Sequence, residues 1–265
     1  MRILVTGATG NIGRMVIDAL DGVDAQVRAL TVDPARAALP AHVEVVVGRL
    51  SDPASCSRAF ADVDRMYLAP LPDTVDEVTR TAAAAGVRRI VDLSGEPESW
   101  WSGVAEAVEA SGVEWTHLWP AEFMENFTQW ADQIRLTGEI RDAYPDSAGV
   151  PIAMADVAGV AAAALISDDL VGTALSLTGP EVVTRLSAAR ALGAALGREI
   201  PFHRLTRVEA VEQLTPSMGD AAEWYLDILA AGLDEPPEPA STVVDLTGST
   251  ITFAEWARAH VDEFR

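Results

Sequence analysis

Three glycines near the start of the chain, at positions 7, 10 and 13, have the spacing of a phosphate-binding turn. The β-branched run Ile3–Thr6 precedes them, and an apolar, helix-like stretch, Arg14–Leu20, follows. In such a unit the glycines allow a tight turn, close approach of the backbone to a pyrophosphate, and close packing of the helix on the strand. The helix N-terminus offers N–H groups and partial positive charge to the phosphates. The pattern predicts dinucleotide binding, with a purely structural turn as the alternative.

The segments after this turn alternate between short apolar runs and helix-like stretches, as in a parallel doubly wound sheet. We predict an α/β fold of the Rossmann type, with the dinucleotide-binding core in residues 1–120. Residues 121–265 are expected to form a small, mostly helical substrate-binding portion that packs on the core and does not fold independently. The predicted strands are Ile3–Thr6, Ala25–Leu30, Val43–Val47, Arg65–Ala69, Arg89–Leu93, Trp115–Leu118 and Leu175–Leu177.

The predicted helices begin at polar caps and end at glycines or turns. They are Arg14–Leu20, one opened by Asp33 and one by Asp52, Val75–Ala85, Val104–Ala110, Phe123–Leu136, Asp156–Ile166 with Asp156 as cap, Ser187–Leu196, Val208–Leu214, Ala221–Ala231 and Phe253–Phe264. An acidic, proline-rich loop is expected over residues 234–241.

Ligands of doubly wound sheets bind beyond the carboxyl ends of the strands. This rule selects the glycine turn and the residues that end or follow the other strands. The predicted cofactor contacts are Gly7, Thr9, Gly10, Asn11, Ile12, Gly13, Thr31, Arg36, Leu50, Ala69, Pro70, Leu71, Ser94 and Pro120.

The composition argues against several classes of function. A net charge of −21 disfavours binding to nucleic acid or to an anionic membrane. No apolar run is long enough to cross a bilayer, and the first strand starts too early to leave room for a signal peptide. The single cysteine, Cys56, fits a reducing compartment, so we expect a cytoplasmic protein. The histidines show no metal-ligand spacing, and no metal site is expected.

Several longer motifs make the chain resemble the NmrA-like branch of the atypical short-chain dehydrogenase/reductase superfamily. The resemblance implies a Rossmann fold that binds NAD(P) and a C-terminal region that shapes a substrate pocket. It also implies either a reductase, such as a quinone reductase or an aromatic polyketide tailoring enzyme, or a redox sensor without turnover. The motifs are VTGATGNIG (5–13), VRALTVDPARA (27–37), GRLSDP (48–53), AAAAGVRRIVDLSG (82–95), EASGVEWTHLWPAEFMENF (109–127), PIAMADVAGVAAAAL (151–165) and LTGPEVVT (177–184).

The residues that distinguish NAD from NADP are inconclusive, so the cofactor is predicted as NAD(P). Thr31 occupies the position where NAD-preferring relatives place an acid, and Val32 the position where NADP-binding relatives often place Arg. Asp33 has the spacing of a ribose-binding acid but is equally explained as a helix cap. Arg14 and Arg36 are candidates for contact with a 2′-phosphate or for solvated helix positions.

The usual acid of the superfamily, Tyr-x-x-x-Lys, is missing because all 19 basic residues are arginines. None of the three tyrosines, Tyr67, Tyr144 and Tyr225, lies near the segment after the fifth strand, where that dyad belongs. Ser94 matches the superfamily's serine and is a candidate to polarise a substrate oxygen, or else a turn residue. Relatives often place His or Lys near residues 100–102 and Arg at the position of Trp119, whereas this chain has Trp100, Trp101 and Ser102 there and Trp at 119.

This absence favours an easily reduced acceptor. Hydride addition to a ketone makes an alkoxide and needs a strong general acid, whereas addition to a quinone makes a phenolate whose conjugate acid has a pKa of about 10. Placement in an aromatic pocket can then suffice. Trp101, Trp119, Phe123, Met124 and Phe127 are the predicted substrate contacts, or alternatively core residues. Asn126 is a candidate to orient the substrate, and His117 is expected to be structural.

The sequence therefore predicts an NAD(P)H-dependent reductase of a quinone or an aromatic, polyketide-like small molecule. Hydroxylation that follows when oxygen reacts with the reduced product is left open. The alternative function is a non-catalytic NAD(P)-binding sensor acting through a protein partner. A homodimer is also left open.

Overall fold

The computed structural model describes residues 1–99, 101–234 and 237–265, which form two compact units. Unit 1 comprises Met1–Pro120, Met154–Leu177 and Thr242–Gly248. Unit 2 comprises Ala121–Ala153, Thr178–Ser241 and Ser249–Arg265. The chain leaves unit 1 after Pro120 and returns to it twice, at Met154–Leu177 and at Thr242–Gly248.

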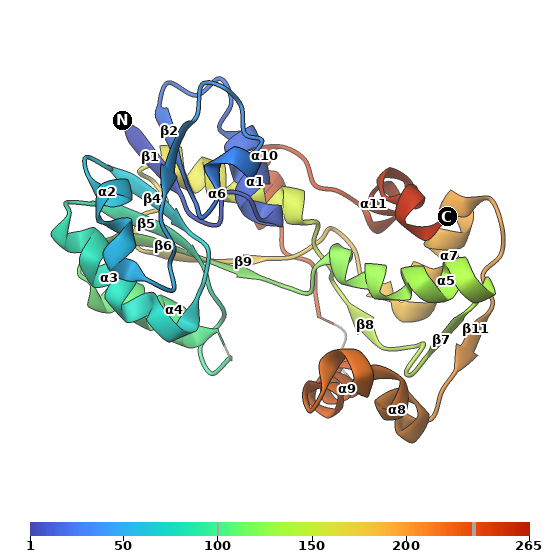
Figure 1. The fold of residues 1–265 in the computed structure, drawn as a ribbon. Coiled ribbons are helices and arrows are strands. Elements are labelled where there is room, and N and C mark those ends of the chain that lie inside the picture. The colour runs from blue at the N-terminus through green and yellow to red at the C-terminus, as the bar shows by residue number, and fades with distance from the viewer. Residues whose placement is uncertain (100, 235–236) are drawn as a thin grey trace. The chain divides into compact units, whose positions relative to one another are not determined.

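Unit 1 is built on a seven-stranded parallel sheet with the strand order β3-β2-β1-β4-β5-β6-β9, which confirms the predicted Rossmann-type fold (Figure 1). The order of the strands reverses between β1 and β4, and this is the position where doubly wound sheets bind ligands. The strands are β1 (Arg2–Val5), β2 (Gln26–Thr31), β3 (Glu44–Val47), β4 (Arg65–Leu68), β5 (Arg89–Leu93), β6 (Glu114–Pro120) and β9 (Thr173–Leu177).

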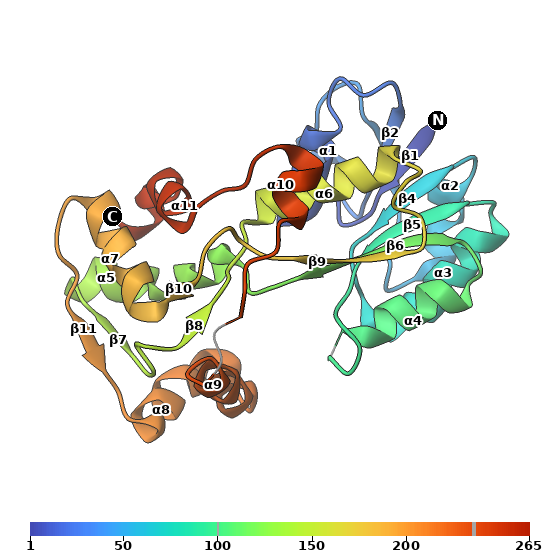
Figure 2. The same ribbon diagram turned by 180° about the vertical axis from the view of Figure 1, so that it is seen from behind.

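Helices cover both faces of this sheet, which explains why its strands are rich in Val, Ile and Leu (Figures 1 and 2). On one face α1 (Asn11–Ala19) and α10 (Thr242–Thr247) pack against α6 (Met154–Ile166). Small side chains along α6 allow this close packing. The other face carries α2 (Ser57–Phe60), α3 (Val75–Ala84) and α4 (Ser102–Ala110), and the short 3-10 helices are η1 (Pro34–Arg36), η2 (Pro53–Cys56) and η3 (Pro72–Thr74).

Unit 2 has its own core, in which aromatic side chains from several segments pack edge to face. Its strands pair as two small ladders, β8 with β10 and β7 with β11. Its elements are η4 (Met124–Trp130), α5 (Ala131–Thr137), β7 (Ile140–Asp142), β8 (Ala148–Gly149), β10 (Val183–Thr184), α7 (Arg185–Leu196), β11 (Phe202–Arg204), α8 (Arg207–Met218), α9 (Ala221–Ala231), α11 (Phe253–Ala259) and η5 (Val261–Phe264).

Several predicted elements differ from the observed ones. Leu175–Leu177 is the end of β9, which joins the main sheet beside β6. The helix predicted to begin at Asp156 begins at Met154, so Asp156 lies in its first turn rather than at its cap. The predicted single helix Phe123–Leu136 is a 3-10 helix followed by α5. Part of the predicted loop 234–241 lies outside the described residues, as does Trp100.

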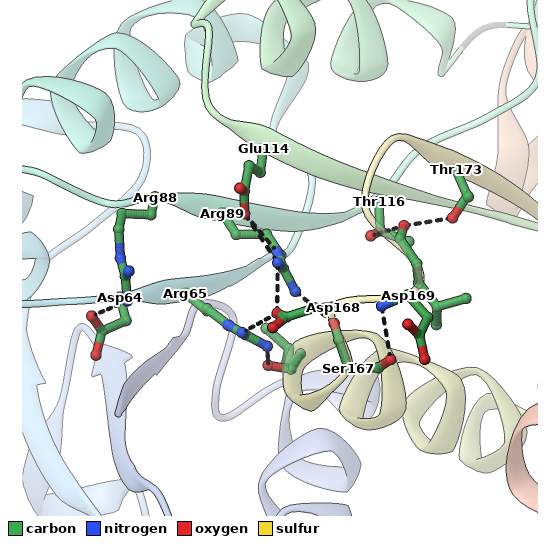
Figure 3. A network of polar contacts seen from close by, with 12 residues as sticks. Asp64, Arg65, Arg88, Arg89, Glu114, Thr116, Ser167, Asp168, Asp169 and Thr173 are labelled. Atoms are coloured by element: carbon green, nitrogen blue, oxygen red, sulfur yellow. Dashed lines mark hydrogen bonds and ion pairs between the residues drawn. The ribbon is translucent and has the colours of Figure 1, made fainter.

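A network of ion pairs lies at the amino ends of the strands of unit 1, the edge opposite the glycine turn (Figure 3). The carboxylate of Asp168, which follows α6, pairs with Arg89 at 2.9 Å and Arg65 at 2.5 Å, and Arg89 also pairs with Glu114. Arg89 and Arg65 lower the pKa of Asp168. Because Asp168 directly follows α6 and pairs with arginines of β4 and β5, the network ties the end of α6 to the sheet.

Candidate functional site

The three predicted glycines form one compact turn after β1. Gly7 has a φ of +58°, a left-handed conformation that favours glycine. A Cβ at Gly13 would lie 2.2 Å from the carbonyl oxygen of Gly7, and a Cβ at Gly7 would lie 2.7 Å from the Cβ of Ala69. The N–H of Gly10 donates to the carbonyl oxygen of Gly7 at 2.8 Å. Side chains at positions 7 and 13 would therefore fill or distort this cradle.

Helix α1 begins at Asn11, directly after the turn. Its N-cap is Gly10, which has no side chain to cap the first turn, and that turn holds no acidic residue. The first N–H groups of a helix have no acceptor within it, so those of Asn11 to Gly13 are available to an anion. Thr9 and Asn11 are exposed beside them. The turn thus fits the pyrophosphate of a dinucleotide, with backbone donors and the positive end of the helix dipole.

Thr6, which the sequence analysis did not single out, joins the turn to the neighbouring strand. Its buried hydroxyl donates to the carbonyl oxygen of Tyr67 at 3.0 Å and accepts the N–H of Ala69 at 2.8 Å. These bonds hold the ends of β1 and β4 together at the topological switch point. A threonine at the end of a strand is too common for its spacing to have indicated this role.

The residues considered for cofactor preference have different partners. Thr31 is buried and its hydroxyl accepts the N–H of Asp33. The carboxylate of Asp33 accepts the N–H of Ala35 at 3.1 Å, which confirms its role as a helix cap. Arg14 donates to backbone carbonyl oxygens of residues 37 and 38. Arg36 is exposed on η1, and its contact with a 2′-phosphate stays a prediction.

The remaining predicted cofactor contacts lie at the same, carboxyl edge of the sheet as the glycine turn. Ser94 is buried directly after β5, where its N–H donates to the carbonyl oxygen of Leu118 on β6. The others are half-buried at or beyond the ends of β3, β4 and β6, namely Leu50, Ala69, Pro70, Leu71 and Pro120.

Three predicted substrate or catalytic residues gather beyond β5 and β6 in unit 1. The hydroxyl of Ser94 and the indole Nε1 of Trp119 are both buried without a hydrogen-bond partner among the described residues. Trp101 precedes α4 with 42% of its surface exposed, and its Cβ would lie 2.9 Å from a Cβ placed on Gly95. The segment after Ser94 therefore folds back so that the backbone of Trp101 lies beside Gly95.

The predicted contacts in unit 2 divide into buried and accessible residues. Met124 and Phe127 are 0% and 2% exposed and pack in the core of unit 2, so we revise them from substrate contacts to core residues. Phe127 packs edge to face against Phe253. Phe123 is half-buried and pairs with Ile152, and Asn126 is exposed. The apolar pattern could not separate these cases, because core and pocket residues have the same hydrophobicity.

The positions of the tyrosines agree with the absence of the usual dyad. Tyr67 lies in β4, where burial raises the pKa of its hydroxyl. Tyr144 and Tyr225 both lie in unit 2. Burial also raises the pKa of Tyr225, whose hydroxyl accepts hydrogen bonds from Gln129 and Arg185. No tyrosine lies in the segment directly after β5, between β5 and β6, and the chain contains no lysine.

Comparison with known proteins agrees with this geometry. The protein family described as NAD(P)H-binding matches residues 7–96. The chain is 35% identical over 281 residues to (4-alkanoyl-5-oxo-2,5-dihydrofuran-3-yl)methyl phosphate reductase of Streptomyces griseus, with 99% of each chain covered. It is 33% identical over 289 residues to NAD(P)H azoreductase of Xenophilus azovorans, again with 99% of each covered.

Two solved structures have the same fold over nearly the whole chain. Triphenylmethane reductase of Citrobacter sp. superposes with a TM-score of 0.86 at 22% identity, covering 99% of this chain and 100% of that one. An NADPH-dependent quinone oxidoreductase from Escherichia coli superposes with a TM-score of 0.83 at 25% identity, with the same coverage.

The fold, the glycine turn and these relatives define an NAD(P)-dependent oxidoreductase. Within that class the chain belongs to the NmrA-like branch of the atypical short-chain dehydrogenase/reductase superfamily, as its motifs predict. Over the described ranges, no helix is long and apolar enough to span a membrane.

Proposed function

We propose that this reductase acts on a quinone or a related aromatic, polyketide-like compound. The names of its relatives support this class of acceptor: an azoreductase, a quinone oxidoreductase and a triphenylmethane reductase act on conjugated π systems. The Streptomyces relative acts on an unsaturated lactone by its name, which is conjugated but not aromatic. A conjugated acceptor spreads the charge that hydride addition creates, and this is the property the names share.

The observation that carries the proposal is the absence of the Tyr-x-x-x-Lys dyad from the segment directly after β5. The chain has no lysine, and its tyrosines lie in β4 or in unit 2. An alkoxide product would need such a donor, whereas a hydroquinone anion, with a conjugate acid of pKa about 10, is stable enough to form with little assistance. The residues therefore favour an acceptor that needs placement more than proton transfer.

Each part of the proposed site has a separate task. A bound NAD(P)H supplies the hydride. The glycine turn and the first turn of α1 hold the pyrophosphate through backbone N–H groups. The Ser94 hydroxyl donates a hydrogen bond to the acceptor oxygen. In unit 1, Trp101 and Trp119 supply aromatic surface for the acceptor. The contact of Phe123 with the acceptor and the orienting role of Asn126, both residues of unit 2, stay predictions from the sequence.

The proposal is tested by following loss of nicotinamide absorbance with NADH and with NADPH across two panels, one of quinones and one of simple ketones. We expect turnover with quinones and none with ketones. Turnover of ketones alone would refute the proposed acceptor class. Binding that distinguishes oxidised from reduced cofactor, without turnover of any acceptor, would instead favour the sensor function.

A further inference from the structure

Three rings stand in a row on one face of β6. Trp115, His117 and Trp119 alternate along the strand, so their side chains point to the same face. The His117 ring is stacked on Trp115, with centroids 4.0 Å apart and planes 12° from parallel, and it is parallel to Trp119, 6.5 Å away and within 8°. We call these three residues the ring ladder.

The middle ring of the ladder is held by carboxylates on both sides. Nδ1 of His117 lies 2.6 Å from Oδ2 of Asp92 on β5, and Nε2 lies 3.3 Å from Oε1 of Glu109 on α4. His117 is 1% exposed and Asp92 fully buried, whereas the side chain of Glu109 is about half exposed. An imidazolium, which donates from both nitrogens, satisfies this arrangement better than a neutral ring with one donor.

The protonation of His117 is decided by these two carboxylates. Burial alone lowers the pKa of His117, but the hydrogen bond and attraction from Asp92, together with those from Glu109, outweigh it and raise the pKa above 6.5. The raised pKa favours the protonated ring, and the orientation of His117 is fixed from β5, from α4 and from the stacked Trp115.

The last ring of the ladder presents an unused donor. Trp119 Nε1 is buried without a partner in the described part of the chain, and the same is true of the Ser94 hydroxyl. Leu93 and Leu118 are in register on β5 and β6, so Ser94 and Trp119 are the next pair on the same face. A buried donor without an acceptor is unfavourable, and two of them on residues that follow one register pair are suited to an oxygen of a ligand.

We propose that His117 is a positioning residue that holds the Trp119 indole so that its N–H and the Ser94 hydroxyl bind the same oxygen of a conjugated carbonyl acceptor. This inference rests on the proposed function for the identity of the ligand. The indole replaces the arginine that the family resemblance leads one to expect at this position. It offers a neutral donor within an aromatic wall, which suits a flat acceptor whose oxygen becomes partly negative as it is reduced.

The direct test is nuclear magnetic resonance of protein labelled with ¹⁵N at the indole nitrogens, titrated with menadione as the probe. The chain has seven tryptophans, and the Trp119→Phe variant assigns the signal of Trp119. We expect menadione to shift this signal in the native protein and to shift it much less in His117→Gln, where the ring is lost. Trp224, which is 58% exposed on α9, is the internal control and should not respond.

Steady-state kinetics provide a second test of this inference. Trp119→Phe keeps the ring and removes the N–H, so KM for menadione should rise by about 3- to 10-fold, the effect of one neutral hydrogen bond. His117→Gln should reproduce that rise, while KM for the nicotinamide cofactor stays unchanged. Glu109→Gln is the milder variant if His117→Gln does not fold, because Glu109 is half exposed. If KM for menadione rises as His117 loses its proton, Glu109→Gln should lower the pH of that rise, because Glu109 helps to raise the pKa of His117.

The outcomes separate this inference from the proposed function. Turnover of menadione without a shift of the Trp119 signal would overturn the inference and leave the function intact. An equal shift in His117→Gln would overturn the role of His117. If menadione is neither bound nor reduced, the proposed acceptor class fails, and the ring ladder is tested on the protein without ligand. The indole signal of Trp119 should then shift with pH as His117 titrates above pH 6.5, and His117→Gln should abolish that shift. If the Trp119 signal does not shift in this way, the positioning role of His117 is overturned as well.

Discussion

A Cβ on Gly13 would lie 2.2 Å from the carbonyl oxygen of Gly7, a separation that no real Cβ contact allows. Gly13 lies in the first turn of α1 and Gly7 in the turn that follows β1, so their contact sets how closely the helix approaches the strand. The obstacle is backbone rather than a flexible side chain, and the turn must move if position 13 gains a methyl group.

We expect Gly13→Ala to weaken NADPH binding on the order of 100-fold, the effect of a displacement near 1 Å at a binding site. Isothermal calorimetry measures the loss. Gly103→Ala is the matched control, because a Cβ there meets nothing within 4 Å, and alanine should stabilise α4 by about 0.5–1 kcal/mol. Unchanged binding in Gly13→Ala would show that the turn does not hold the cofactor.

Arg36 is expected to contact the 2′-phosphate that distinguishes NADPH from NADH. It is exposed on η1, whereas Arg14 is engaged with backbone carbonyl oxygens. Arg36→Gln should weaken NADPH binding by about tenfold or more, the effect of a charge-assisted hydrogen bond, and leave NADH binding unchanged. Dissociation constants for both cofactors provide the measurement, and equal losses for both would contradict the assignment.

Asp142 and Arg185 form a buried ion pair in the core of unit 2. Both are at most 5% exposed, Trp130 Nε1 donates to the same carboxylate at 2.7 Å, and the Arg185 guanidinium lies 4.8 Å from the Trp130 ring centre. Asp142→Asn leaves a buried cation poorly paired and should lower the free energy of unfolding by about 3–5 kcal/mol. Urea unfolding measures the change.

The exposed pair between Arg204 and Asp146 is the control for this prediction. Both side chains are more than 60% exposed, so Arg204→Ala should change the free energy of unfolding by less than about 1 kcal/mol. Similar losses in the two variants would mean that burial does not determine the strength of the Asp142 interaction.

Glu122 gives a pH dependence of stability. Burial raises the pKa of its carboxyl group, and Asp142 adds to the rise although Arg185 opposes it. A raised pKa means that the folded state binds the proton more tightly than the unfolded chain, so stability falls as pH rises from 4.5 through the folded pKa. Glu122→Gln should therefore raise Tm at pH 7 and have no effect below pH 4.5. A lower Tm at pH 7 would show that the ionised carboxylate is stabilising.

Local patterns in the sequence identify the glycine turn, the alternation of strands and helices, and the cap at Asp33. These features depend on neighbouring residues and on the backbone freedom of glycine, so they can be predicted without the fold. The strands and helices predicted for the second half of the chain are less accurate, because distant contacts fix these elements. Strand β9 pairs with β6, and α6 packs on α1. Such contacts join segments that are far apart in the chain.

Hydrophobic pattern also could not separate pocket residues from core residues. Phe123 and Phe127 are both apolar and close in sequence, yet only Phe127 is enclosed by the aromatic core of unit 2. His117 was expected to be structural, and the strand assignment was correct. The two carboxylates that hold it come from β5 and α4, and no spacing in the sequence indicated that they meet.

By itself the sequence determined that this chain binds a dinucleotide in a Rossmann-type turn and that no lysine takes part in its chemistry. Both follow from residue type alone, through glycine spacing and a missing side chain. The tertiary structure decided that Thr6 ties the turn to β4 and that Met124 and Phe127 belong to a core. It also decided that Ser94 and Trp119, which follow the register pair Leu93 and Leu118, both bury donors without a partner among the described residues, because register between strands is set by the packing of the whole sheet.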